Sequence, residues 1–222
     1  MKVIIGCERS QEVCLAFRAK GHEAYSCDLQ ECAGDHPEWH FQDDIFEVLK
    51  RFKPKLGIFH PPCTFLTVTA NKWLNDQPER ASGKLVGEAR REARREAIEF
   101  FMKLWNYDIE HICIENPVGN INSILPPTQI IQPYYFGDEA QKTTCLWLKN
   151  LPPLFHAKQV DLFNSEITHV CKGEMVEFKS GKRMAKWYVD ASKESSNDRT
   201  NIRSKTFSGI AKAMAEQWNF QQ

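Results

Sequence analysis

The sequence predicts an α/β fold in which a mostly parallel sheet carries helices on both faces, followed by a small C-terminal annex. Short β-type runs alternate with helical stretches through the first two-thirds of the chain, which is the pattern of parallel strands joined by crossover helices. The length of 222 residues suits one domain with its own core. Hydrophobic residues make up 42% and charged residues 26%, as in ordinary globular proteins.

The first elements each have a local signal. An apolar run at 3–6 predicts the first strand. A helix is predicted over 10–20, because Val13 and Phe17 stand four residues apart and Gly21 suits the left-handed position after a helix. The elements predicted next are strands at 24–27 and 39–41, a helix at 45–52 and a strand at 56–60.

A long loop and a strong helix follow the fourth strand. The Pro61-Pro62 pair ends that strand, because proline cannot donate to a β-ladder. Residues 64–84 have no clear period, so they predict a long functional loop. Residues 88–105 contain good helix formers with apolar side chains near helical spacing. The remaining predictions are strands at 111–114 and 144–148, a hairpin at 175–189 around Ser180-Gly181 and a closing helix at 204–218.

Charge is balanced over the whole chain but uneven along it. Lys plus Arg and Asp plus Glu both number 29, so no overall basic field indicates a nucleic-acid partner. Residues 1–50 hold ten acidic and five basic side chains, whereas residues 172–205 hold nine basic and five acidic ones. If a polyanion binds, we expect it on the C-terminal quarter. A salt-bridged solvated face, rather than a phosphate-binding one, is predicted for Arg90, Arg91, Arg94 and Arg95, which are interleaved with glutamates.

The eight cysteines do not indicate a secreted protein. No long apolar segment or cleavage signal follows the first residues, so a reducing cytoplasm is expected. No apolar run approaches the roughly 20 residues that span a bilayer, and no membrane partner is expected. Cys27, Cys32, His36 and His40 match no standard zinc-ligand spacing, so the sequence predicts no metal site.

Polar residues follow several predicted strands at the end where an open parallel sheet binds ligands. They are Cys7-Glu8-Arg9-Ser10, Asp28, Asp43-Asp44, Pro61-Pro62-Cys63 and Glu115-Asn116-Pro117. Asp28 suits an adenosine ribose, because a carboxylate accepts hydrogen bonds from both hydroxyls; a solvated loop acid is the alternative. His60 is expected either to line the site or to be a buried structural histidine.

Cys63 and Glu115 are the candidates for covalent and acid–base chemistry. A thiol after two stiff prolines is positioned for nucleophilic attack if its pKa is lowered, and an inert buried cysteine is the alternative. Glu115 can act as a general acid or bind a substrate amidine, and a capping or turn-forming element is the alternative.

Two of these motifs together resemble a known family. Pro61-Pro62-Cys63, followed by Ile114-Glu115-Asn116-Pro117-Val118, resembles the Pro-Cys and Glu-Asn-Val motifs of cytosine-5 DNA methyltransferases, most closely a compact phage and prophage group. The resemblance implies a Rossmann-like class I methyltransferase fold. It also implies a cofactor-binding and catalytic domain over 1–150, a small basic recognition segment over 151–203 and a helix over 204–222 that returns to the catalytic domain.

The resemblance implies a reaction and a role for each motif residue. S-adenosylmethionine is the implied cofactor, and the implied reaction is methyl transfer to carbon 5 of cytosine in DNA through a thiolate adduct, in a bacterial or phage-infected cell. Cys63 would add to carbon 6, and Glu115 would hold and protonate ring nitrogen 3. Asn116 would orient the loop. Lys142 stands where the family usually has Arg and would stabilise the pyrimidine oxygen or a phosphate.

Two further sets of residues are assigned by the same resemblance or by composition. Cofactor contacts are expected from Gly6, Cys7, Glu8, Asp28, Asp44, Ile45 and Pro61. Contacts to duplex or single-stranded DNA are expected from the basic and aromatic residues Lys179, Lys182, Arg183, Lys186 and Trp187, which also suit an ordinary basic hairpin. The loop at 64–84 would close over a flipped base.

The chain also departs from the family, and the departures keep other functions open. Gly6-Cys7-Glu8-Arg9-Ser10-Gln11 replaces the Gly-rich first motif, and only about 50 residues are available for target recognition. The alternatives are the same chemistry on a cytosine nucleotide or with a modified cofactor, and a DNA-binding protein without activity. A magnesium nuclease based on Asp28, Asp43 and Asp44 is a third possibility.

Overall fold

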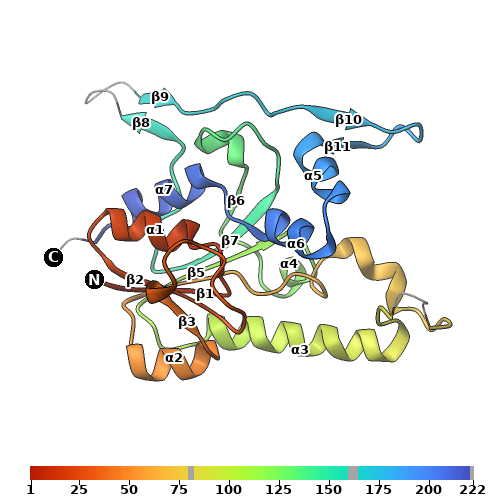
Figure 1. Ribbon diagram of the computed structural model, residues 1–222, viewed down its shortest axis with the longest axis horizontal. Coiled ribbons are helices and arrows are strands. Elements are labelled where there is room, and N and C mark those ends of the chain that lie inside the picture. Colours follow the sequence, from red (N-terminus) through yellow and green to blue (C-terminus); the bar gives the residue numbers. More distant parts are fainter. Residues whose placement is uncertain (80–82, 160–164, 221–222) are drawn as a thin grey trace.

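A seven-stranded sheet forms the centre of the molecule in the computed structural model, which describes residues 1–79, 83–159 and 165–220 (Figure 1). Its strands are β1 (Lys2–Gly6), β2 (Glu23–Asp28), β3 (His40–Gln42), β4 (Leu56–Phe59), β5 (His111–Pro117), β6 (Gln129–Ile131) and β7 (Thr144–Lys149). The α-helices are α1 (Glu12–Ala19), α2 (Ile45–Phe52), α3 (Gly87–Trp105), α4 (Ile121–Ile124), α5 (Lys186–Asp190), α6 (Ser196–Ser204) and α7 (Ser208–Gln217).

The strand order confirms the predicted fold class. Across the sheet the order is β3-β2-β1-β4-β5-β7-β6. The first five strands run parallel in the order of a doubly wound fold. β7 runs antiparallel to both β5 and β6. A parallel Rossmann-like sheet with one reversed strand near its edge is the predicted class I methyltransferase fold.

Side chains alternate between two cores along the strands. Val3 and Ile5 face one core, which α1 and α7 cover, whereas Ile4 faces the other, which α2 and α3 cover. Figure 1 shows the two helix pairs on opposite faces of the sheet. The second core includes Phe101 and Trp147, whose rings meet edge to face at 5.0 Å. Burial on both faces explains why β4 is apolar throughout and β1 is apolar after its exposed first residue, Lys2.

Most predicted elements are present with ends shifted by one or two residues, and α2 has the predicted bounds. The strand predicted at 111–114 continues to Pro117, because residues 115–117 pair with β7. The hairpin predicted at 175–189 is shorter: β10 (Met175–Glu177) pairs with β11 (Arg183–Ala185), and α5 follows directly. The sequence pattern did not predict α4, α6, β6, β8 (Ala157–Gln159) or β9 (Ser165–Ile167).

The segments after β7 form the annex and return to the sheet. Buried side chains of α7 share a core with α1, including Ile210 and Met214 against Val13 and Phe17. The α5 residue Trp187 donates its indole N–H to the carbonyl oxygen of Gln141 at 3.2 Å, just before β7. None of the helices within the described ranges has the length and apolarity needed to cross a membrane.

Candidate active site

Cys63 lies on a turn directly after β4, at the carboxyl end of the parallel strands. The backbone N–H groups of Leu66 and Thr67 donate to its carbonyl oxygen at 3.0 and 3.2 Å. From β5, the buried side chain of Asn116 donates to the carbonyl oxygen of Pro61 at 2.7 Å. The turn is therefore tied to the neighbouring strand, while Cys63 itself is exposed.

Glu115 lies beside this turn on β5 and is only 8% exposed. The imidazole Nδ1 of His60 is 3.1 Å from its Oε2 atom. Burial alone would raise the pKa of this carboxyl, but Lys142, His60 and Thr144 outweigh burial and hold the pKa below its ordinary value. Glu115 is therefore an ionised carboxylate at neutral pH.

The thiol of Cys63 shares its electrostatic surroundings with Glu115 and Lys142. Although Cys63 is exposed as a residue, the protein packed around its sulfur removes water from the thiol and raises its pKa; the Glu115 carboxylate raises this pKa further, and Lys142 lowers it in part. The three groups come from the turn after β4, from β5 and from the segment before β7. The pKa of Cys63 is therefore raised, whereas the prediction of nucleophilic attack required it to be lowered.

Lys142 is fixed between the sheet and the annex. Its backbone N–H donates to Oε1 of Gln132 at 3.0 Å, and its Nζ is 3.5 Å from the carbonyl oxygen of Lys205. Because the segment at 205 leads into α7, the position of this ammonium depends on how the annex packs.

The loop between β1 and α1 turns through residues other than glycine that adopt left-handed backbone conformations. Cys7 and Gln11 both adopt left-handed conformations, with φ of 58° and 60°. Between them the buried carboxylate of Glu8 accepts hydrogen bonds from the backbone N–H groups of Val13 at 2.8 Å and Cys14 at 3.3 Å. A carboxylate of this chain therefore occupies the N-terminus of α1.

Gln11 fastens the same loop to the segment after β2. Its amide donates to the carbonyl oxygen of His36 at 2.7 Å and accepts from the His36 N–H at 3.1 Å. A Cβ atom on Gly34 would lie 2.5 Å from the Gln11 side-chain oxygen, so this approach requires a glycine.

Acidic groups surround the end of β1. The pKa of the Cys7 thiol is raised by burial and then by Asp28, Cys27 and Asp44, which shows that these groups lie close to it. Asp28 is half-buried, and its Oδ1 atom accepts from the N–H of Gln30 at 2.9 Å. Asp44 caps α2 through the N–H groups of Phe46 and Glu47.

The other predicted cofactor contacts have packing roles at this end of the sheet. A Cβ atom on Gly6 would lie 2.6 Å from the Phe59 ring and 2.9 Å from Ile45, so Gly6 allows these two side chains to pack. Ile45 is buried in the core under α2, and Pro61 is buried below the Cys63 turn. Whether these three touch a cofactor stays a prediction.

The acids predicted as an alternative magnesium site have other partners. Asp43 pairs with Arg51 at 2.7 Å, and Asp44 is used as a helix cap. Among the described residues, no group of three or more His, Cys, Asp and Glu side chains is placed to hold a metal ion.

The basic residues proposed for DNA contact divide into two groups. Lys179, Lys182 and Arg183 are exposed on the β10–β11 hairpin. Lys186 forms an ion pair with Glu174. Trp187 is half-buried, with its ring against Phe207 and Tyr188, so it anchors the annex and does not present a free stacking surface.

The α3 arginines correct the expectation of a purely solvated face. Arg91 and Arg95 do pair with Glu88. Arg90 is 6% exposed, and its guanidinium donates to the carbonyl oxygen of Thr64 at 3.2 Å. Arg94 donates to the carbonyl oxygen of Phe65 at 2.8 Å. These two arginines hold the loop that follows Cys63, a role that sequence periodicity could not reveal because it depends on the path of the loop.

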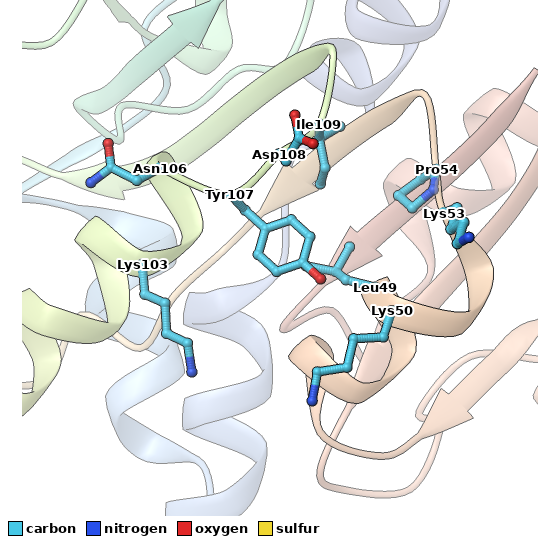
Figure 2. A pocket seen from close by; sticks show the side chains of 9 residues that line it. All are labelled: Leu49, Lys50, Lys53, Pro54, Lys103, Asn106, Tyr107, Asp108 and Ile109. Atoms are coloured by element: carbon cyan, nitrogen blue, oxygen red, sulfur yellow. The ribbon is translucent and has the colours of Figure 1, made fainter.

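A separate hollow of about 680 Å³ lies at the opposite end of the sheet, before β4 and β5 (Figure 2). Figure 2 shows Lys50, Lys53 and Lys103 around it, with Tyr107 between them. Lys50 pairs with Glu47, and Lys103 lies 3.9 Å from the centre of the Phe46 ring. Because ligands in this fold class bind at the carboxyl ends of the strands, the Cys63 end is the candidate site.

The chain resembles known proteins only at the level of solved structures. No family model and no curated protein matches the chain. Among solved structures, the crystal structure of a mutant of the Spodoptera frugiperda protein DNMT2 is similar, with 14% sequence identity and a TM-score of 0.37. The likeness covers 68% of this chain and 51% of that one, so the chain spans about half of that structure.

Proposed function

We propose that the protein transfers a methyl group from S-adenosylmethionine to carbon 5 of cytosine in DNA. The observation that supports the proposal is the meeting of the Cys63 thiol, the buried Glu115 carboxylate and the Lys142 ammonium at the carboxyl end of the sheet. Carbon 5 of cytosine is a poor nucleophile until a thiolate adds to carbon 6. A carboxyl at ring nitrogen 3 and a cation at the pyrimidine oxygen stabilise the charge that this addition creates.

The β1–α1 loop and the acidic groups near it favour binding of a cation over binding of a phosphate. Dinucleotide-binding folds place a phosphate at the N-terminus of the first helix, but here Glu8 occupies those N–H groups. With Asp28 and Asp44 close by, the loop attracts positive charge. S-adenosylmethionine carries a sulfonium and an ammonium, and when bound it supplies an electrophilic methyl group. The Asp28 carboxylate suits its ribose hydroxyls.

The residues would act in sequence on a cytosine flipped out of the helix. Cys63 loses its proton and its sulfur bonds to carbon 6, while Glu115 holds ring nitrogen 3. Because Glu115 is ionised in the free protein, a bound base must exclude water and raise the pKa of this carboxyl before it can donate. Lys142 lowers the pKa of the attacking thiol. After carbon 5 has been methylated, loss of its proton to water would restore the ring double bond and release the Cys63 thiolate.

DNA would approach along the annex. Lys179, Lys182 and Arg183 on the β10–β11 hairpin are exposed and suit contact with phosphates. The Arg90 and Arg94 contacts would hold the loop after Cys63 near the flipped base.

Covalent trapping tests the proposal. DNA that contains 5-fluorocytosine is incubated with the protein and S-adenosylmethionine, and the adduct is mapped by mass spectrometry. We expect an adduct at Cys63 that is absent in Cys63→Ala and retained in Cys171→Ala, since Cys171 is an exposed cysteine outside the site. Labelled methyl transfer to deoxycytidine monophosphate but not to DNA would identify a nucleotide substrate. No adduct and no transfer to either substrate would overturn the proposal.

The raised pKa of Cys63 favours one second candidate, a DNA-binding protein on a methyltransferase scaffold. A thiol that stays protonated at neutral pH is a weak nucleophile. Gel shifts distinguish this function: it predicts cofactor-independent DNA binding that Cys63→Ala leaves unchanged, together with no covalent adduct.

A further inference from the structure

His60 connects two strands of the site. It is the first residue after β4, and its backbone N–H donates to the carbonyl oxygen of Gly6 at the end of β1, at 2.9 Å. Its side chain reaches in the other direction to Glu115 on β5. Because β4 lies between β1 and β5 in the sheet, His60 joins the end of β1 to the buried carboxylate.

The contact between the two side chains is shielded from water. The His60 and Glu115 side chains are 8% and 10% exposed. A carboxylate only accepts hydrogen bonds, so Nδ1 of His60 carries the shared proton. The second ring nitrogen, Nε2, is buried and has no hydrogen-bond partner within the described residues. Packing and the Glu115 contact therefore fix the ring.

The charged groups around this pair come from every neighbouring element. Glu8 lies in the β1–α1 loop, and His60 is near enough to lower the pKa of that carboxyl against the larger effect of burial. Lys142, before β7, and Thr144 at its start act on Glu115 together with His60. The Glu115 carboxylate in turn acts on Cys63.

We propose that His60 is a positioning residue that fixes the Glu115 carboxylate through the Nδ1–H···Oε2 hydrogen bond and links it to the end of β1. The role of Glu115 in catalysis rests on the proposed function, whereas the hydrogen bond and its effect on the ionisation of Glu115 do not require turnover. Without His60, the buried carboxylate loses a donor and takes up a proton at a higher pH.

The acid dependence of stability tests the proposal without any substrate. Urea unfolding is followed at several pH values across the ordinary Glu pKa of about 4.3. We expect His60→Leu to move the midpoint of the acid-induced loss of stability upward, by about one unit, because the Glu115 carboxylate loses a hydrogen-bond donor. His60→Asn retains a side-chain donor and should keep the wild-type midpoint.

A double-mutant comparison makes the test specific. In the Glu115→Gln background, His60→Leu should cause no further shift. An equal shift in both backgrounds, or no shift in the single variant, would overturn the proposal. Circular dichroism and the labelling rate of Cys171 show whether each variant is folded.

Methyl transfer separates this proposal from the proposed function. Where transfer to DNA is measurable, His60→Leu should lower kcat more than it changes KM, and His60→Asn should restore kcat. If the midpoint of the acid-induced loss of stability shifts but neither wild type nor any variant transfers methyl groups, the positioning role stands and the proposed reaction fails. If wild type is active and His60→Leu changes neither the midpoint nor kcat, the positioning role fails alone.

Discussion

The Cys63 thiol is balanced between two side chains of opposite charge. Glu115 opposes its ionisation and Lys142 supports it, with burial as the largest contribution. The balance means that a change at either side chain alters the reactivity of the sulfur without touching it.

Replacement of Lys142 should make Cys63 less reactive. Lys142→Ala removes a cation that lowers the Cys63 pKa, so we expect several-fold slower alkylation of Cys63 at neutral pH. Lys142→Arg keeps the charge and should stay near the wild-type rate. Lys179→Ala, which removes an exposed cation on the β10–β11 hairpin, is the control. Faster labelling in Lys142→Ala would contradict the argument.

Glu115 should make the free energy of unfolding decrease at acidic pH. Its pKa is lower in the folded protein than in the unfolded chain, so its carboxylate stabilises the fold above the ordinary Glu pKa of about 4.3. This contribution is lost as the pH falls through the folded value. In urea unfolding at several pH values, wild type should lose stability relative to Glu115→Gln on acidification. A constant difference between the two proteins would show that the carboxylate is not preferentially ionised.

At the scale of elements, the β1–α1 loop carries unusual backbone strain. Two residues other than glycine, Cys7 and Gln11, adopt left-handed conformations within five positions. Each costs about 1 to 2 kcal/mol relative to an ordinary conformation. Glu8 and the Gln11 hydrogen bonds to His36 hold the loop in this shape.

Glycine at position 7 should therefore stabilise the protein. Cys7→Gly relieves the left-handed strain, and we expect the free energy of unfolding to rise by about 1 kcal/mol. Ser10→Gly is the matched control, because Ser10 has no positive φ and glycine there costs about 0.5 kcal/mol of chain entropy. Urea unfolding measures both. Equal destabilisation of the two variants would mean that the strain at Cys7 is not significant.

Glu8 should have the opposite pH dependence to Glu115. Burial raises the pKa of Glu8 in the folded protein, although His60 and two backbone N–H groups oppose the rise. Its contribution to stability is therefore complete below the ordinary Glu pKa of about 4.3 and is lost as the pH rises through the folded value. Relative to Glu8→Gln, wild type should become less stable as the pH rises. A gain of relative stability would reverse the assigned sign.

The predictability of each element depended on how local its signal was. The helix at 45–52 carries its own cap at Asp44 and a strong apolar face, and its predicted bounds are correct. β6 has only three residues and is stabilised by its partner β7, so its own sequence has no period to detect. β5 was predicted too short because Glu115-Asn116-Pro117 belong to a strand only through pairing with β7.

In the candidate site, too, the features with a local sequence signal could be predicted, and those that depend on distant segments could not. The order of the Cys63 and Glu115 motifs can be read along the chain, and the sheet explains why such residues meet at one edge. The direction of the Cys63 pKa shift, the Glu8 cap and the His60 contact depend on burial and on groups from distant segments. Such properties cannot be obtained from spacing alone.

At the scale of the whole molecule, the sheet places the acidic groups at the end of β1 next to the Cys63 turn after β4. β1 and β4 are neighbours, so the Glu8 and Asp28 region adjoins the Cys63 turn. The annex contacts both sides: the carbonyl oxygen of Lys205 lies near the Lys142 ammonium, and the Lys205 side chain pairs with Glu12 at 2.6 Å. Movement of the annex would therefore affect both halves of the site.

The charge of this arrangement predicts which nucleotide cofactor binds. A carboxylate at the N-terminus of α1, with Asp28 and Asp44 nearby, repels a pyrophosphate and attracts a cation. In calorimetry we expect binding of S-adenosylmethionine, weaker binding of S-adenosylhomocysteine and none of NAD. Asp28→Asn should weaken binding at least about tenfold, or about 1.4 kcal/mol, because it removes the negative charge and replaces one of the two acceptor oxygens for the ribose hydroxyls with a donor.

Asp35→Asn is the matched control, because Asp35 is an exposed acid in the loop after β2 and should leave the affinity unchanged. Added salt should weaken S-adenosylmethionine more than S-adenosylhomocysteine, since only the former carries the sulfonium charge. Binding of NAD, or equal affinities and salt dependence for the two adenosyl ligands, would show that Glu8 and its neighbours do not select a cation. The region would then serve only to hold α1 in place.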